Sequence, residues 1–342
     1  MPLGVTSSEQ KSVAIIGLGS IGGVVAGALS AVDRYDIVAC VRRPIERLTV
    51  ERPEGGIEVP IFALTDPARA TPVDWVLLCT KTQDAASSAP WLERLCGERT
   101  RVATLQNGIG QSERLAPFVG NATVIPTIVY YNSERLAPDR VRYRRTGEYD
   151  FAVRDDAGGQ AFAALLDGTS MRILRSGDFK TLVWRKLLIN AVANPVSALT
   201  LQRNAVFWRE DVKSLCLALL EEAAAVGRAD GAQLAADEPA QSMAWLVAIP
   251  PDAGSSMYFD RLAGRPLEIE ALTGAVVAAG ERHHVPTPLM RMLLTLARGE
   301  GGAGRFTWSR RQPGSMTQVV VLRRTSDTTR YRWILRYGPA RA

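Results

Sequence analysis

The stretch that decides the fold is Val13-Ala-Ile-Ile-Gly17-Leu-Gly19-Ser-Ile-Gly22-Gly23. It joins an apolar run to a G-x-G-x-x-G loop and then to small residues that continue to Ser30. A loop of this kind between a strand and a helix is typical of a βαβ unit that binds a dinucleotide. Its first glycine permits a tight turn, its second lets a pyrophosphate approach the backbone, and its third lets helix and strand pack closely. A merely flexible turn is the alternative, but we expect cofactor contacts from Gly17, Leu18, Gly19, Ser20, Ile21 and Gly22.

Short apolar runs alternate with helical stretches through the first half of the chain. The runs are rich in Val, Ile and Leu, as expected of strands that are buried on both faces. Strands and helices that alternate at this spacing predict an α/β fold with a doubly wound parallel sheet. Further β-prone segments lie at 141–143 and 149–153, followed by a helix near 160–167 and a strand at 171–174. The main predicted strands are Val13–Gly17, Asp36–Val41, Asp74–Thr80, Arg101–Gln106 and Thr123–Tyr131.

The second half of the chain changes character after Gly177 and reads as helical. We therefore expect a dinucleotide-binding domain over residues 11–177 and an all-α substrate domain over residues 178–300. A segment rich in Ala, Asp and Pro after Ala229 reads as a loop. The predicted helices are Phe179–Thr200, Val212–Ala229, Met257–Leu262, Glu268–Glu281 and Pro288–Arg298.

The net positive charge of the chain comes from its C-terminal end. The chain has 342 residues and a formal net charge of +6, yet residues 301–342 hold nine Arg and a single acid and so carry +8, which leaves −2 for residues 1–300. The body of the protein therefore gives no reason to expect a nucleic-acid partner. We interpret residues 301–342 as an Arg-rich extension outside the two domains; a nucleic-acid-binding arm and an extra β element are the alternatives.

Cysteine usage and hydropathy exclude other classes. Four widely spaced cysteines are too few for a disulfide framework or a zinc site, so we expect a reducing compartment and no metal. No apolar run approaches the ~18 residues of a membrane span, and residues 1–10 lack a basic leader, so we expect a cytoplasmic protein without a membrane partner.

The end of the second predicted strand bears on the choice of cofactor. An acidic residue there would accept the ribose 2′-hydroxyl of NAD, whereas a basic residue can receive the 2′-phosphate of NADP. Here the strand runs into Ala39-Cys40-Val41-Arg42-Arg43, without an acid. The sequence therefore favours NADP(H), with Arg42 on the phosphate; two solvated surface charges are the alternative.

A polar stripe crosses the first predicted helix of the second half. Lys186, Asn190 and Asn194 are each four residues apart, so they lie on one helical face, and nearly every neighbour is apolar. A buried lysine with two buried amides requires polar partners or a water-filled cleft, although a narrow solvated stripe would show the same spacing. Burial lowers the pKa of a lysine, which would make Lys186 a proton donor near neutral pH.

A second candidate segment runs from Ser255 to Glu270. Here Ser256 and Glu268 could belong to a site, but either serine could also be a helix cap, and Pro266 fits the first turn of a helix whose dipole Glu268 would favour. Two further candidates, Lys81 and Asn107, follow the ends of predicted strands. Ligands bind beyond those ends in an open parallel sheet, so both are expected to face the cofactor cleft unless they serve only as turn residues.

In their order and spacing these motifs resemble the ketopantoate reductase (2-dehydropantoate 2-reductase) family over residues 11–299. The resemblance implies an N-terminal Rossmann-type domain, a helical C-terminal domain and NADPH-dependent reduction of 2-dehydropantoate to pantoate, on the route to pantothenate and coenzyme A. It implies Lys186 as the general acid that protonates the developing alkoxide, and Glu268 as the group that helps to position Lys186 and the substrate hydroxyl. It further implies a substrate site formed by Asn107, Asn190, Asn194 and Ser256, with Lys81 lining the same cleft.

Other functions remain open at this point. Asp252-Ala253-Gly254 stands where members of the family often carry Asn, and paralogues with the same catalytic helix reduce other 2-oxo acids. A dehydrogenase that uses His283 or His284 is a second enzyme hypothesis, although both fall in a predicted loop. A non-catalytic NADP-binding sensor is a third. Exposed apolar positions in the helical half would allow a homodimer.

Overall fold

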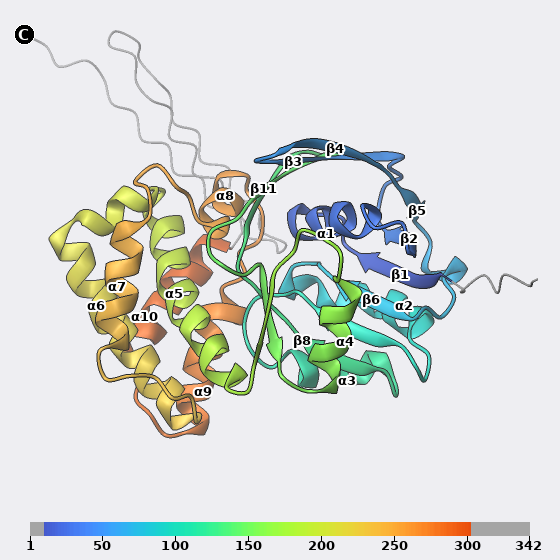
Figure 1. The fold of residues 1–342 in the computed structure, drawn as a ribbon. Coiled ribbons are helices and arrows are strands. Elements are labelled where there is room, and N and C mark those ends of the chain that lie inside the picture. Colours follow the sequence, from blue (N-terminus) through green and yellow to red (C-terminus); the bar gives the residue numbers. More distant parts are fainter. Residues whose placement is uncertain (1–9, 302–342) are drawn as a thin grey trace, which may run out of the picture.

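The computed structural model describes residues 10–301, so the predictions for residues 302–342 lie outside the part described. A sheet-containing part and a helical part lie side by side (Figure 1). The sheet-containing part includes every strand from Lys11 to Ser176, and the helical part starts at Phe179.

A six-stranded sheet forms the centre of the first part, and the strands paired in it are parallel. Its spatial order is β5-β2-β1-β6-β7-β8, with the glycine-loop strand β1 between β2 and β6. The predicted doubly wound sheet is therefore confirmed. Its strands are β1 (Lys11–Ile16), β2 (Tyr35–Cys40), β5 (Phe62–Leu64), β6 (Trp75–Leu78), β7 (Arg101–Thr104) and β8 (Thr123–Pro126).

Alternation along β1 accounts for the two layers of helices. Val13 and Ile15 belong to the same apolar cluster as the buried face of α1 (Ser20–Ser30) and α4 (Ala157–Leu165). Ala14 and Ile16 point to the opposite side, into a cluster with α2 (Ala85–Leu95) and α3 (Gln111–Val119). Because successive side chains of a strand point to opposite faces, a continuous apolar run is what such a doubly covered strand requires.

A second, four-stranded sheet covers the outer side of α1 (Figure 1). Glycines in α1 allow this close packing: a Cβ at Gly23 would lie 3.0 Å from Val141 Cγ1, and one at Gly27 would lie 2.8 Å from Val50 Cγ2. The sheet has the order β10-β11-β3-β4, with β3 (Arg47–Arg52), β4 (Gly55–Pro60), β10 (Asn132–Ala137) and β11 (Arg140–Arg144). Of these strands, only the segment around Val141 was predicted.

A small third sheet connects the two parts of the molecule. It has the order β13-β12-β9 and packs near the start of the first long helix of the helical part. Its strands are β9 (Ile128–Val129), β12 (Phe151–Arg154) and β13 (Ile173–Ser176), and two short helices, η1 (Pro67–Arg69) and η2 (Thr82–Asp84), complete the first part.

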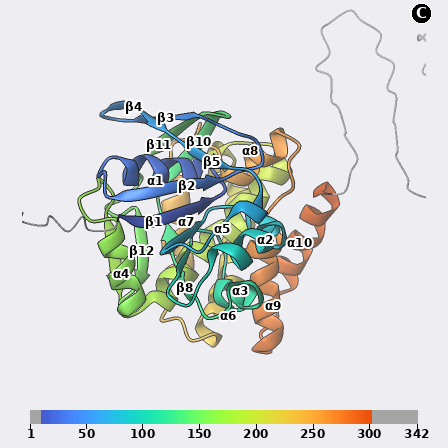
Figure 2. The ribbon, with the colours of Figure 1, turned by 90° about the vertical axis from the view of Figure 1, so that its right-hand side faces the viewer.

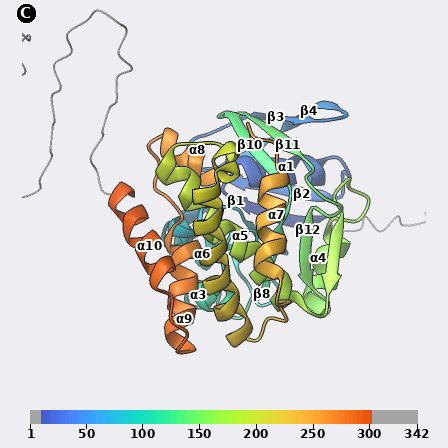
Figure 3. The same cartoon turned by 90° about the vertical axis from the view of Figure 1, so that its left-hand side faces the viewer.

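The helical part is arranged around α5 (Phe179–Thr200), which contacts most of the other helices (Figure 3). Pro195 lies inside α5 and has no N–H to give to the carbonyl of Ala191. The buried hydroxyl of Thr273 donates to that carbonyl at 2.7 Å, so the carbonyl left free by the proline receives its hydrogen bond from the π-helical turn that contains Thr273. The other elements are η3 (Asn204–Trp208), α6 (Glu210–Ala229), α7 (Glu238–Ala248), α8 (Ser256–Leu262), the π-helical turn η4 (Glu270–Gly274), α9 (Ala275–Arg282) and α10 (Pro288–Gly301).

Two local predictions in this region were wrong. The loop expected after Ala229 contains α7, which begins at Glu238 with a proline in its first turn. The continuous helix expected from Glu268 instead begins with the π-helical turn at Glu270, and Pro266 lies in irregular chain before it. Glu268 is therefore not the first-turn carboxylate of a helix, and its partners lie elsewhere.

Candidate active site

The glycine loop connects β1 to α1 at the carboxyl edge of the sheet. Gly17 has φ +91°, and a Cβ at Gly22 would lie 2.2 Å from the carbonyl oxygen of Gly17, so both positions require glycine. A Cβ at Gly19 would meet nothing within 4 Å, and no side chain caps the N-terminus of α1. The loop thus leaves open space over a helix N-terminus, which fits the pyrophosphate of a dinucleotide.

The candidate cofactor residues follow neighbouring strands along this edge. Arg42 and Arg43 are exposed after β2, the glycine loop follows β1, Lys81 follows β6, and Asn107 follows β7. Since β2, β1, β6 and β7 are adjacent in that order, these groups form one line across the edge. An extended dinucleotide has the length and shape to lie along such a line.

Lys186 on α5 reaches across to the far end of the line. Its Nζ donates to Asn107 Oδ1 at 3.1 Å and to the backbone carbonyl of Val129 at 2.5 Å. Burial lowers the pKa of Lys186 to about 8, and the negative charge of Glu268 acts in the opposite direction. The lysine lines a narrow pocket whose other polar residues are Gln106, Asn107, Gln111, Thr127 and Asn190.

Glu268 binds Lys81 rather than Lys186. The Lys81 Nζ lies 2.9 Å from Glu268 Oε2 and 2.9 Å from Asp260 Oδ2, and both carboxylates are almost completely buried. The backbone N–H of Thr82 donates to Glu268 Oε1 at 3.0 Å. Burial lowers the pKa of Lys81, but the two carboxylates outweigh burial and raise it. Glu268 therefore acts on Lys186 through its charge, and on Lys81 and Thr82 through hydrogen bonds.

Asp260 is a site residue that sequence reasoning missed. Its second oxygen, Oδ1, accepts from Arg265 Nε at 2.8 Å, so this carboxylate joins two cations. The ion pairs of Lys81 with Asp260 and Glu268 join the end of β6 to the helical part, across more than 170 positions of sequence. A usable signal was present, since Asp260 lies four residues after Ser256 and therefore on the same side of α8.

Of the other candidate substrate residues, one lines the Lys186 pocket and two do not. Asn190 lines the pocket with Lys186, whereas Asn194 is buried on α5 outside the pocket lining. Ser256 is exposed at the first turn of α8. Ser255 is the helix cap: its Oγ accepts from the N–H of Tyr258 at 3.0 Å and lies 2.7 Å from Ser197 Oγ.

Neither histidine lines the pocket. Both follow α9 in the predicted loop, and His283 hydrogen-bonds through Nε2 to Asp230 Oδ1 at 2.9 Å. Asp230 also accepts from Trp184 Nε1 at 2.9 Å. The His283–Asp230 pair therefore joins the C-terminal ends of α9 and α6. The geometry gives the histidine-based hypothesis no support.

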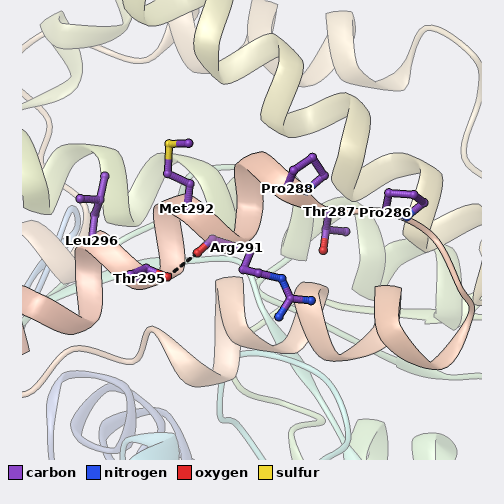
Figure 4. Close-up of a pocket in the computed structure, with 7 residues that line it drawn as sticks. All are labelled: Pro286, Thr287, Pro288, Arg291, Met292, Thr295 and Leu296. Atoms are coloured by element: carbon purple, nitrogen blue, oxygen red, sulfur yellow. Dashed lines mark hydrogen bonds between the residues drawn. The ribbon is translucent and has the colours of Figure 1, made fainter.

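A separate hollow lies along α10, between Pro286 and Leu296 (Figure 4). Two of its three polar side chains already have partners: the Thr295 hydroxyl donates to the carbonyl of Arg291, and the Arg291 guanidinium pairs with Glu281 at 2.8 Å. Figure 2 shows α10 at the edge of the helical part. This apolar surface offers no chemistry comparable to the Lys186 pocket.

Residues 10–301 contain neither a membrane-spanning helix nor a cluster of metal ligands. No helix there is long and apolar enough to cross a membrane, and no group of three or more His, Cys, Asp and Glu side chains is placed to hold a metal ion. The four cysteines are unpaired, and burial raises the pKa of Cys40 to about 12 and that of Cys96 to about 11.

Comparison with known proteins places these features in one family. Residues 13–156 match the family model "Ketopantoate reductase PanE/ApbA", and residues 178–300 match "Ketopantoate reductase PanE/ApbA C terminal". The 2-dehydropantoate 2-reductase of Caulobacter vibrioides is 39% identical over 290 residues, which is 84% of this chain and 98% of that protein. That of Mycobacterium tuberculosis is 36% identical over 286 residues, covering 83% and 96%.

Solved structures agree with the sequence relatives. A dimeric ketopantoate reductase from Staphylococcus aureus superposes with a TM-score of 0.76 at 25% identity, over 85% of this chain and 98% of that one. A ketopantoate reductase from Ralstonia eutropha gives the same TM-score and coverage at 28% identity. Such enzymes use a nicotinamide cofactor, which fits the open glycine loop described above. The chain therefore belongs to the ketopantoate reductase family and is an oxidoreductase that acts on a CH–OH group.

Proposed function

We propose that this protein reduces 2-dehydropantoate to pantoate with NADPH, and that Lys186 is the general acid. The observation that carries the proposal is the position of the Lys186 ammonium: it reaches from the helical part to Asn107, at the end of the line that starts with Arg42 and the glycine loop. Its pKa of about 8 keeps most of the lysine protonated at neutral pH while leaving the proton easy to release.

The glycine loop and Arg42 would hold the cofactor, which would supply a hydride to the ketone carbon. Negative charge then develops on the ketone oxygen, and an ammonium group beside that oxygen stabilises the charge and delivers a proton. The amide of Asn107 and the carbonyl of Val129 both accept from Lys186 Nζ, so they aim the lysine while one of its N–H bonds remains available for the oxygen.

The remaining polar residues hold the substrate in this proposal. Asn190 lies one helical turn beyond Lys186 in the same pocket, and its amide is available to a carboxylate or hydroxyl group. Asn194 and Ser256, which do not line this pocket, stay proposed substrate residues on the family resemblance alone. The charge of Glu268 partly offsets the effect of burial on the pKa of Lys186, and with Asp260 it holds Lys81 beside the cofactor line.

Arg42 is proposed to select NADPH over NADH by receiving the 2′-phosphate. Replacing Arg42 with Ala should lower the affinity for NADPH more than tenfold and leave that for NADH nearly unchanged, because the lost contact is a charge-assisted one. The adjacent Arg43→Ala variant is the matched control. If the ratio of the affinities for NADPH and NADH is unchanged in Arg42→Ala, Arg42 does not bind the 2′-phosphate.

The direct test of the proposed activity is NADPH oxidation with 2-dehydropantoate beside a panel of 2-oxo acids. We expect the highest kcat/KM with 2-dehydropantoate. Higher turnover of another acid would identify a paralogue, and tight NADPH binding without turnover of any acid would identify a sensor. The homodimer also stays a prediction; the Staphylococcus aureus neighbour is described as dimeric, and α10 exposes Met292 and Leu296 here.

A further inference from the structure

Gln106 lies between the end of β7 and Asn107, and the orientation of its amide is fixed by the protein. Its Nε2 donates to the Thr80 carbonyl at 3.2 Å, to Thr80 Oγ1 at 3.1 Å and to the Lys81 carbonyl at 3.3 Å. Two of these partners are carbonyl oxygens, which can only accept, so the nitrogen must face them. The oxygen of the amide therefore faces the other way.

That oxygen is a buried acceptor without a hydrogen-bond donor among residues 10–301. Gln106 is only 4% exposed, its Oε1 has no partner in this part of the chain, and the residue lines the same pocket as Lys186 and Asn190. Leaving a buried acceptor unpaired is costly, so such an atom in a ligand pocket points to a donor on the ligand.

The position of Gln106 indicates which part of the ligand it meets. Its amide rests on Thr80, and Thr80 in turn packs against the glycine loop, since a Cβ at Gly17 would lie 2.8 Å from Thr80 Cγ2. Gln106 follows β7, two strands beyond β1 and on the side away from Arg42. With the 2′-phosphate at Arg42 and the pyrophosphate at the glycine loop, the nicotinamide end falls at β7.

We propose that Gln106 Oε1 accepts a hydrogen bond from the carboxamide N–H of the nicotinamide ring, and so fixes the ring's orientation toward Lys186. Gln106 is thus a cofactor-positioning residue. This inference rests on the proposed function, because it requires a nicotinamide dinucleotide along the sheet edge. The carboxamide supplies the neutral donor that the unpaired oxygen needs, and its place at β7 favours it over the hydroxyl of 2-dehydropantoate, the other neutral donor, which the experiment below distinguishes.

The test compares two cofactors in binding experiments without turnover. Isothermal titration calorimetry gives Kd for NADP⁺ and for its 3-acetylpyridine analogue, in which a methyl group replaces the carboxamide nitrogen. The proteins are the wild type, Gln106→Met, which keeps the length of the side chain but lacks the acceptor, and Thr104→Val. Thr104 is the matched control, because its Oγ1 is also buried without a partner but does not line the pocket.

The wild type and Thr104→Val should bind the analogue about fivefold more weakly than NADP⁺, the effect of one neutral hydrogen bond. In Gln106→Met this difference should disappear. The same difference in all three proteins would overturn the inference. A second result would also overturn it: if Gln106 binds the hydroxyl of 2-dehydropantoate instead, Gln106→Met should raise the KM for 2-dehydropantoate but not that for 3,3-dimethyl-2-oxobutanoate, which lacks this hydroxyl. Failure of the wild type to bind NADP⁺ at all would instead contradict the proposed function.

A crystal structure of the wild type with NADP⁺ tests the same contact without a variant. Gln106 Oε1 should then lie within hydrogen-bonding distance of the carboxamide nitrogen. A carboxamide oxygen at that position, or a ring turned away from Gln106, would overturn the inference even if Gln106→Met fails to fold.

Discussion

Replacing Lys186 with Met should change how stability depends on pH. The variant keeps the length of the side chain but carries no charge, so the comparison isolates the cost of holding an ammonium group in the pocket. The lysine lies among largely apolar α5 neighbours, and burial lowers its pKa from 10.5 to about 8. A lowered lysine pKa means that the folded protein disfavours the charged form relative to the unfolded chain.

The magnitude follows from that shift. A difference of one pKa unit corresponds to about 1.4 kcal/mol, so below pH 8 the charged lysine costs the folded state at most about 3 kcal/mol. Between about pH 8 and 10.5 the unfolded chain binds more protons than the folded protein, and wild-type stability therefore rises with pH in this window. By pH 10 the cost should have fallen to about 1 kcal/mol.

Urea unfolding of both proteins at pH 7, 8, 9 and 10 measures the effect. The variant also loses two hydrogen bonds, to Asn107 and Val129, but that loss shifts its stability by a similar amount at each pH. Other titrating groups cancel in the difference between the two proteins. The wild type should gain about 2 kcal/mol on the variant between pH 7 and 10. A difference that does not change with pH, or that changes in the opposite direction, would refute a lowered pKa for Lys186.

Three further predictions concern other parts of the site. In Glu268→Gln the loss of a negative charge should lower the pKa of Lys186, so kcat/KM should begin to fall at a lower pH than in the wild type; coinciding pH profiles would contradict this effect. Asp260→Asn should cost about 1 kcal/mol in urea unfolding, because it removes the buried carboxylate that pairs with the partly exposed Lys81 and the exposed Arg265, and unchanged stability would show that the ion pairs contribute nothing. Gly22→Ala should lower Tm by several degrees, whereas Gly19→Ala should keep Tm and weaken NADPH binding; equal effects of the two in both assays would contradict the loop geometry.

The sequence was informative where function depends on local pattern. Backbone sterics and helical periodicity leave patterns that can be recognised in a sequence. They allowed us to predict the glycine loop, the buried parallel strands and the shared helical face of Lys186, Asn190 and Asn194. Strands β3 and β4 were missed although Leu48 and Val50, and Ile57 and Val59, alternate with polar residues; each run has only two apolar positions among charged residues and glycines, so the signal is short.

Contacts between distant segments could not be read from any local pattern. The pairing of Lys81 with Asp260 and Glu268 joins two parts of the chain that have separate hydrophobic cores. For the same reason the partner of Glu268 was expected to be Lys186. The carbonyl of Val129, which accepts from Lys186 Nζ, has no sequence signal at all, because every residue carries one.

The central claim is that Lys186 protonates the ketone oxygen while the rest of the site binds cofactor and substrate. It is tested most directly by the kcat of Lys186→Met with NADPH and 2-dehydropantoate, together with the Kd of that variant for NADPH. We predict a fall in kcat of about 10²- to 10⁴-fold, as for loss of a general acid, with NADPH affinity within a few-fold of the wild type. A variant that keeps its kcat within tenfold of the wild-type value would contradict the account.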